Sequence, residues 1–193
     1  MYQSSAAFTE LVQKDSRTFR SKLILGENEI ESGIKSITLK GGSNSGTSFI
    51  IGSCISQYIE VEMEKPSIFI ENEELEWRIG ADISATVEEF VPMGFFTAGK
   101  PEADEDMIKF TAFDRMLKAD RGYFSSLPAA TTTIAVLNEM SAFLKVPIAT
   151  GGLSSITIKR PDGYTCREVL SYISQMYAGF AICNRQGQIE IKK

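Results

Sequence analysis

The 193-residue sequence contains no histidine. This absence removes the commonest general base, the catalytic triads that depend on imidazole, and most zinc sites. Cysteine is scarce, because only Cys54, Cys166 and Cys183 are present, and no two of them have CxxC spacing. An odd number of scattered cysteines predicts free thiols in a reducing compartment.

Long apolar runs are also absent. No stretch approaches the roughly 20 apolar residues that cross a bilayer as a helix, so we expect no membrane association. The first five residues, Met1-Tyr2-Gln3-Ser4-Ser5, do not begin a basic segment followed by an apolar one, so no secretory signal is expected. Hydrophobic residues make up 43% of the chain and charged residues 23%, which is ordinary for a globular protein with a real core.

The charge is unevenly distributed along the chain. Residues 1–106 contain 9 Lys/Arg and 19 Asp/Glu, whereas residues 107–193 contain 11 Lys/Arg and 6 Asp/Glu. An acidic first part argues against binding to a phosphate backbone, and the basic residues of the second part are scattered rather than clustered. We therefore expect no specific nucleic-acid binding.

A two-residue hydrophobic period runs from Phe19 to Phe113 and predicts about seven short strands. In its clearest stretch, residues 59–64, isoleucine, valine and methionine alternate with three glutamates. Successive strand residues point to opposite faces, so this pattern predicts one dry face and one strongly anionic face. Residues 74–79 repeat it and place Trp77 inward. We expect Asn72-Glu73 to form a hairpin turn, separate strands near 84–91 and 94–98, and an exposed acidic loop at 99–106.

The helical signals lie near the N-terminus and in the last third. A short amphipathic helix is predicted around Phe8, and a longer one over 131–144. Thr165 and Glu168 have the spacing of a capping box and predict the start of another helix, with Gly179 as its C′ glycine. A strand over 153–159 and a hairpin over 180–192 complete the pattern.

These elements predict a β-rich α+β fold. Residues 1–115 are expected to form an N-terminal helix and an antiparallel β-barrel or sandwich. Residues 116–193 are expected to form a smaller α/β segment with two helices, a strand and a C-terminal hairpin. A C-terminus that follows a strand without a tail hints that the natural protein continues.

The sequence offers several candidate chemical sites, and none is complete. The glycine-rich residues 41–47 lack the Lys-Ser/Thr of a phosphate-binding loop. Residues 102–106 alternate acids but lack the central glycine and closing glutamate of a calcium loop. A glycosidase needs two acids about 5–10 Å apart across a cleft, and the spacing of acids along the sequence does not give that distance.

Two other positions in the sequence carry candidate chemical groups. Cys166 follows the predicted helix start, but a structural cysteine is the better interpretation. Asp114-Arg115 is interpreted as a local cap or ion pair. We predict no catalytic, cofactor-binding or metal-binding residue.

The order of the motifs resembles a known family. The chain is similar to the N-terminal portion of phage and prophage tail proteins related to the trimeric baseplate hub. The motifs that carry the resemblance, beginning near Phe8, are residues 20–23, 34–37, 48–54, 58–61, 91–96, 110–116, 123–124, 131–133, 165–170 and 179–181. Each motif alone is a common strand or cap pattern. The resemblance rests on the order in which the motifs occur, which is shared over nearly the whole chain.

The resemblance implies a virion structural protein, not an enzyme. Relatives have a β-barrel joined to a smaller α/β part and assemble as a ring-shaped homotrimer that links the tail tube to the tip. The genome passes through the ring, and other tail proteins are the partners. The implied location is the virion, and the bacterial cytoplasm before assembly. No catalytic residue is carried over, and no cofactor is implied.

Three hypotheses remain open from the sequence. The first is the tail-tip hub, in which part of the acidic surface at 60–64 or 71–76 faces the channel and repels DNA over about 8–10 Å. The second is a carbohydrate-binding module for the host surface, which requires an exposed aromatic platform. The third is a cell-wall hydrolase that acts through paired carboxylates.

Overall fold

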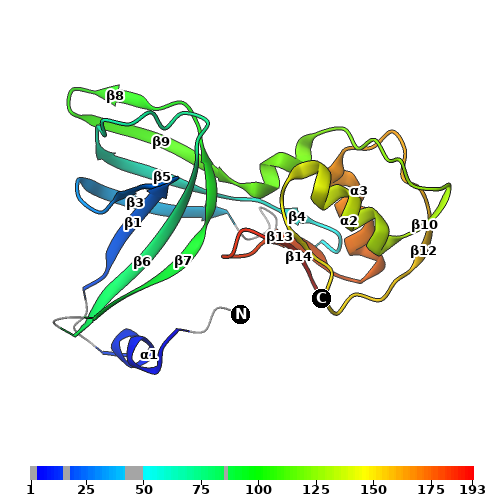
Figure 1. The fold of residues 1–193 in the computed structure, drawn as a ribbon, viewed down its shortest axis with the longest axis horizontal. Coiled ribbons are helices and arrows are strands. Elements are labelled where there is room, and N and C mark those ends of the chain that lie inside the picture. Colours follow the sequence, from blue (N-terminus) through cyan, green and yellow to red (C-terminus); the bar gives the residue numbers. More distant parts are fainter. Residues whose placement is uncertain (1–3, 15–17, 42–49, 85–86) are drawn as a thin grey trace. The chain divides into compact units, whose positions relative to one another are not determined.

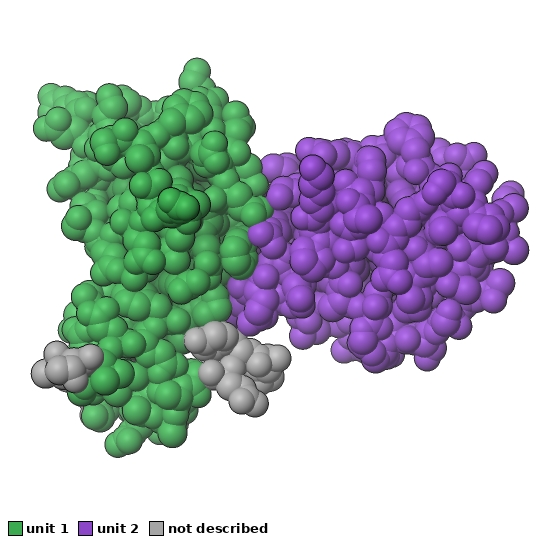
Figure 2. Space-filling view, viewed as in Figure 1, with its two compact units in different colours: residues 1–39, 59–112 green, residues 40–58, 113–193 purple. Residues whose placement is uncertain are grey.

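The computed structural model describes residues 4–14, 18–41, 50–84 and 87–193. The chain divides into two compact units, shown in green and purple in Figure 2. Unit 1 comprises residues 1–39 and 59–112, and unit 2 comprises residues 40–58 and 113–193. The predicted division of the chain at residues 115/116 stays a prediction. The glycine-rich residues 42–49 lie outside the described residues.

Unit 1 contains the short helix α1 (Ala6–Val12), capped by the Ser5 hydroxyl, and most of a large antiparallel sheet (Figure 1). The strand order is β2-β1-β6-β7-β9-β5-β3, with β8 paired to β9. The strands of this sheet are β1 (Arg20–Leu25), β2 (Asn28–Ile30), β3 (Ile34–Gly41), β5 (Gln57–Glu64), β6 (Glu74–Ser84), β7 (Val87–Ala98), β8 (Glu102–Asp104) and β9 (Met107–Asp114).

The two-residue period is confirmed by burial in this sheet. Ile59, Val61 and Met63 are buried, whereas the intervening glutamates lie on the opposite face. Leu75 and Trp77 on β6 are buried against the same cluster. A β-rich α+β fold, with a large antiparallel sheet, smaller sheets and helices, is therefore the observed architecture.

Two predicted features of the sheet are wrong. First, the predicted barrel is not closed: among the described strands the pairing forms an open path from β2 to β3. Second, Asn72-Glu73 does not join a hairpin, because β5 and β6 are not neighbours in the sheet. The Asn72 N–H instead donates to the carbonyl of Ala98 (2.8 Å), and the Ala98 N–H donates to the carbonyl of Glu73 (2.9 Å). These bonds tie the connection to the end of β7, and its Ile70 enters the core.

The strands predicted at 84–91 and 94–98 are one strand, β7, from Val87 onward, and Ser84 is the last residue of β6. A register shift opposite Trp77 and Arg78 absorbs the irregularity at Pro92 and at Gly94, whose φ is 150°. Such a bulge bends a strand without ending it, so the proline and glycine do not divide it. The predicted acidic loop contains the short strand β8, and its charged residues are exposed as expected.

Unit 2 contains a small four-stranded sheet covered by helices. Its strand order is β11-β14-β13-β4, with β13 and β14 antiparallel and both outer strands parallel to their neighbours. The elements of this unit are β4 (Cys54–Ile55), the 3₁₀ helix η1 (Arg115–Asp120), β10 (Ala130–Thr132), α2 (Thr133–Leu144), β11 (Ile148–Ala149), β12 (Thr157–Lys159), α3 (Cys166–Met176), β13 (Phe180–Cys183) and β14 (Ile189–Lys192). The C-terminal hairpin is confirmed, and the predicted strand at 153–159 is limited to β12.

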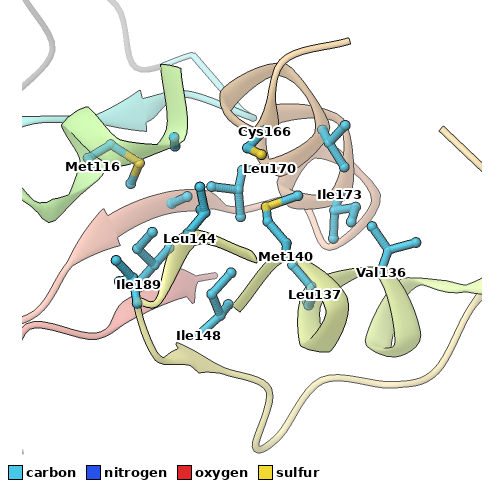
Figure 3. Packing of buried hydrophobic residues seen from close by; sticks show 14 of the residues in the cluster. Met116, Val136, Leu137, Met140, Leu144, Ile148, Cys166, Leu170, Ile173 and Ile189 are labelled. Carbon is cyan, nitrogen blue, oxygen red and sulfur yellow. The ribbon is translucent and has the colours of Figure 1, made fainter. Parts of the chain in front are cut away.

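The core of unit 2 forms where α2 and α3 meet the sheet (Figure 3). Leu137 and Met140 of α2, Leu170 of α3 and Ile189 of β14 are each at most 1% exposed. Burying a large aliphatic side chain contributes about 1.5–3 kcal/mol, so this contact holds the helices on the sheet.

Both ends of α3 are set by local contacts. The predicted capping box is confirmed, because the Glu168 N–H donates to Thr165 Oγ1 (3.2 Å) and the Thr165 N–H donates to the Glu168 carboxylate (2.7 Å). The predicted C′ role of Gly179 is wrong, because Ala178 takes the left-handed conformation with φ 53°. Gly179 is needed for another reason: a Cβ there would collide with the carbonyl oxygen of Lys192 on β14.

Candidate interaction surfaces

The polar face of the large sheet carries both signs of charge. Glu62 on β5 lies between Lys35 of β3 (2.6 Å) and Lys109 of β9 (3.7 Å). The hydrogen bond from Lys35 lowers the pKa of Glu62, and the charge of Lys109 adds to the effect. The face predicted to be strongly anionic is therefore partly neutralised at its centre.

Other cations extend this pairing across the sheet. Arg20 contacts Asp82 (2.5 Å) and Glu88 (2.8 Å), and Lys22 contacts Glu29 (2.8 Å) and Glu31 (2.5 Å). Exposed pairs each contribute only about 0–1 kcal/mol. These pairs therefore add little stability. Their main effect is to reduce the negative electrostatic potential of this face.

One end of unit 1 is different, and we call it the acidic tip: Phe69 together with the exposed residues Glu102, Asp104, Glu105 and Asp106 of the β8–β9 hairpin. The Lys65 N–H donates to the carbonyl of Asp106 (2.8 Å), so the connection that carries Phe69 is attached to the hairpin. Phe69 is 73% exposed, more than any other large hydrophobic residue among those described in unit 1. The tip therefore combines a protruding ring with clustered carboxylates.

Trp77 lies inside, as the alternation predicted. It is 4% exposed and packs in the core of unit 1. Its indole Nε1 has no hydrogen-bond partner among the described residues. A carbohydrate-binding platform cannot be built on a ring that does not reach the surface.

Arg167 of α3 connects several segments of unit 2. Its guanidinium donates to the carbonyl of Cys54 (3.2 Å), to the hydroxyl of Ser56 (3.0 Å) and to the carbonyl of Met116 (3.0 Å), and it makes a two-pronged ion pair with Asp120. The planar fork of an arginine suits this pattern because its donors point in fixed directions. Arg167 thus holds α3, η1 and the strand β4 together.

Asp114 is the buried carboxyl next to this centre. It is 2% exposed and accepts hydrogen bonds from the backbone N–H of Gln57 (2.7 Å) and of Met116 (3.1 Å), as the cap of η1. Burial raises its pKa to about 6, although both hydrogen bonds and the charge of Arg167 oppose the shift. The predicted local cap is confirmed.

Glu139 of α2 is a second saturated carboxylate. It accepts hydrogen bonds from the hydroxyls of Tyr123 (2.5 Å) and Ser125 (2.6 Å), and from the hydroxyl and backbone N–H of Ser126 (both 2.8 Å). Burial raises its pKa, but these donors outweigh burial and lower the pKa to about 2. Glu139 thus holds the 123–126 segment against α2 through these hydrogen bonds.

The cysteines are free thiols, as predicted. Burial raises the pKa of both Cys54 and Cys166 to about 11, and it raises that of Cys183 further. Thiols with raised pKa values are poor nucleophiles. For Cys166, burial outweighs the charge of Arg121 and a backbone hydrogen bond, both of which lower the pKa, and this supports a structural role.

The surface of unit 2 is hollowed beside α3. We call this hollow, of about 500 Å³, the α3 groove. Apolar and aromatic side chains of α3 and the preceding segment form much of its wall, notably Tyr164, Tyr172 and Met176, and Lys159 and Arg160 lie at its rim. The rings of Tyr164 and Tyr172 meet edge to face at 5.3 Å. These three side chains are 42–50% exposed.

Sequence reasoning did not identify either the acidic tip or the α3 groove. The apolar run Ile68-Phe69-Ile70 lies in a connection, and in the structure Ile70 is buried whereas Phe69 is exposed. The groove joins residues 158–164 to α3, and only the packing of the helix reveals it.

Two further observations concern metals and membranes. Within the described residues, no group of three or more His, Cys, Asp or Glu is placed to hold a metal ion. No helix in the described ranges is long and apolar enough to cross a membrane. The predicted absence of catalytic, cofactor-binding and metal-binding residues stays a prediction.

The two units define a class of fold: a curved antiparallel sheet combined with a small α/β unit. No protein family and no curated protein matches the chain. Among solved structures, the fold is similar to the crystal structure of the 43 kDa tail protein of prophage MuSo2 from Shewanella oneidensis. The TM-score is 0.57 at 12% identity, over 90% of this chain and 52% of that one. The chain thus spans about half the length of that protein, with which it shares a fold.

Proposed function

We propose that this chain is a structural component of a bacteriophage or prophage tail. The observation that carries the proposal is the fold shared with the MuSo2 tail protein over 90% of this chain. The order of motifs along the sequence supports the same assignment independently of the fold.

Within the tail, we assign the chain to the hub at the tip. There it would link the tail tube to the tip as part of a homotrimeric ring through which DNA passes. Its partners would be other copies and neighbouring tail proteins, and its location the virion, or the bacterial cytoplasm before assembly. This assignment rests on the order of motifs that resembles the baseplate-hub family.

A non-enzymatic role fits the chemistry of the buried carboxyls. Asp114 and Glu139 have the most shifted pKa values among the described carboxyls, and such shifts are common in active sites. Here, however, both groups accept several hydrogen bonds that hold chain segments, and neither lines the α3 groove. Their shifts are explained by structure, so a carboxylate hydrolase gains no support.

We propose that the glutamates at 60–64 face the channel, but that they repel DNA less than their number alone predicts. Glu62 is paired with two lysines, so its repulsion of DNA is reduced. Glu76 is likewise paired with Arg78 (2.7 Å). A trimer structure with Glu60 and Glu64 on the outer rim would end this part of the proposal.

Interrupting the gene in the phage that encodes the chain tests the proposal. Because a hub joins tube to tip, we expect DNA-filled heads with missing or incomplete tails and a loss of infectious particles, restored by the gene supplied in trans. A silent substitution at the same site is the matched control. Complete tails in the interrupted phage would refute the assignment.

A further inference from the structure

The two units carry opposite net charge. Unit 1 contains 9 Lys/Arg and 19 Asp/Glu, whereas unit 2 contains 11 Lys/Arg and 6 Asp/Glu. Two copies of the chain are therefore electrostatically complementary when unit 1 of one meets unit 2 of the other. Complementary charge steers such encounters and selects their orientation.

The local surfaces have the same complementarity. The acidic tip has four exposed carboxylates within five residues, and the part of the chain described here shows no ion pair for any of them. The α3 groove has two cations at its rim, Lys159 and Arg160, against one acid, Asp162. Arg160 donates through one nitrogen to the carbonyl of Leu127 (2.8 Å), which orients the side chain.

The apolar parts match as well. Phe69 presents a ring that is 73% exposed, and the groove presents the half-exposed side chains of Tyr164, Tyr172 and Met176. A volume of about 500 Å³ is within the usual range of binding pockets, about 300–1,000 Å³. Interfaces commonly place an aromatic anchor in an apolar pocket and surround it with a polar rim.

We infer that the α3 groove of one copy binds Phe69 and the β8–β9 hairpin of a second copy. In this contact the ring enters between Tyr164 and Met176, and the hairpin carboxylates face Lys159 and Arg160. The contact is head-to-tail, because different surfaces meet, and repetition of such a contact builds a closed ring or a filament. The inference deepens the proposed function by naming a contact between copies, and it rests on the self-association proposed there.

Sedimentation velocity of the 193-residue chain tests the contact, from low micromolar to several hundred micromolar concentration and at low and high salt. We expect self-association that weakens as salt rises, because salt screens exposed charges. Phe69→Ala and the double variant Lys159→Glu/Arg160→Glu should each weaken association at least tenfold.

Two variants outside both surfaces serve as controls. Phe124→Ala removes a ring that is 85% exposed, and Lys145→Glu/Arg185→Glu reverses two exposed charges elsewhere on unit 2. Both controls should associate like the wild type.

A charge swap makes the test specific. Glu102→Lys/Glu105→Lys should fail to associate alone, and a mixture of this variant with Lys159→Glu/Arg160→Glu should recover association. A wild-type chain that remains monomeric throughout would overturn the inference. Normal association of the groove variants would also overturn it and would leave the groove to another partner. The inference would fail too if the groove variants lost association while Phe69→Ala associated like the wild type. None of these results bears on tail assembly, which gene interruption tests separately.

Discussion

At the residue scale, Asp114 is a buried group whose ionisation is coupled to folding. Its pKa is about 6 in the folded chain against an ordinary 3.8, because burial disfavours the carboxylate. Between these values the folded state keeps a proton that the unfolded state releases. The contribution of Asp114 to stability is therefore complete below about pH 4 and is lost as pH rises to about 6.

This shift gives a pH-dependent prediction. The free energy of unfolding of the wild type, minus that of Asp114→Asn, should fall by on the order of 2 kcal/mol between pH 4 and pH 7. Urea unfolding at several pH values measures it. The difference between the two proteins is needed because Glu139 and Glu168, whose pKa values are lowered, act in the opposite direction. A constant difference across this range would contradict the assignment.

Arg167 provides the second residue-scale prediction. Arg167→Lys should lower the free energy of unfolding by about 2 kcal/mol, because one ammonium cannot serve Ser56, Asp120 and two carbonyls together. Arg185→Lys, at an exposed turn, is the matched control and should change stability by less than about 0.5 kcal/mol. Equal stabilities for the two variants in chemical denaturation would show that the network contributes nothing.

The residues themselves were predictable where their role is local. The Thr165–Glu168 capping box and the cap at Asp114 depend on neighbours in the sequence, so the sequence contained the whole signal. The Arg167 contacts join residues 54, 56 and 120, and no short-range pattern encodes them.

At the element scale, Gly179 determines how α3 joins the terminal hairpin. Gly179→Ala should lower the free energy of unfolding by about 1–3 kcal/mol, because the added methyl group would meet the backbone carbonyl of Lys192, which cannot move without opening the β13–β14 pair. Gly151→Ala is the control, since nothing lies within 4 Å of its Cβ position. Thermal unfolding of both variants checks this. A Gly179 variant as stable as the control would mean that the close approach is not present in solution.

Strands were easier to predict than their partners. The two-residue period identified β5 and β6 because alternation is a property of each strand alone. Pairing depends on contacts between distant segments, and the Asn72 turn conformation, with φ 63°, is equally compatible with a hairpin and with the observed crossing connection. For the same reason, the period indicated a large antiparallel sheet but not that its described strands leave it open.

At the scale of the whole molecule, the sequence indicated the charge asymmetry but not its use. The opposite charges of the two units were countable from composition. The tip and the groove, by contrast, exist only after folding attaches the connection that carries Phe69 to the hairpin and brings the 158–164 segment to α3. Sequence motifs therefore could not predict the acidic tip or the α3 groove, because known motifs describe catalytic and ligand-binding patterns.

The proposed place of the chain in the tail-tip hub is tested most directly by cryo-electron microscopy of intact particles. We predict density for both units at the tip, arranged as three copies around the tail axis, with Glu60, Glu62 and Glu64 facing the channel. Density for the chain in a side fibre, or its absence from purified particles, would contradict the claim.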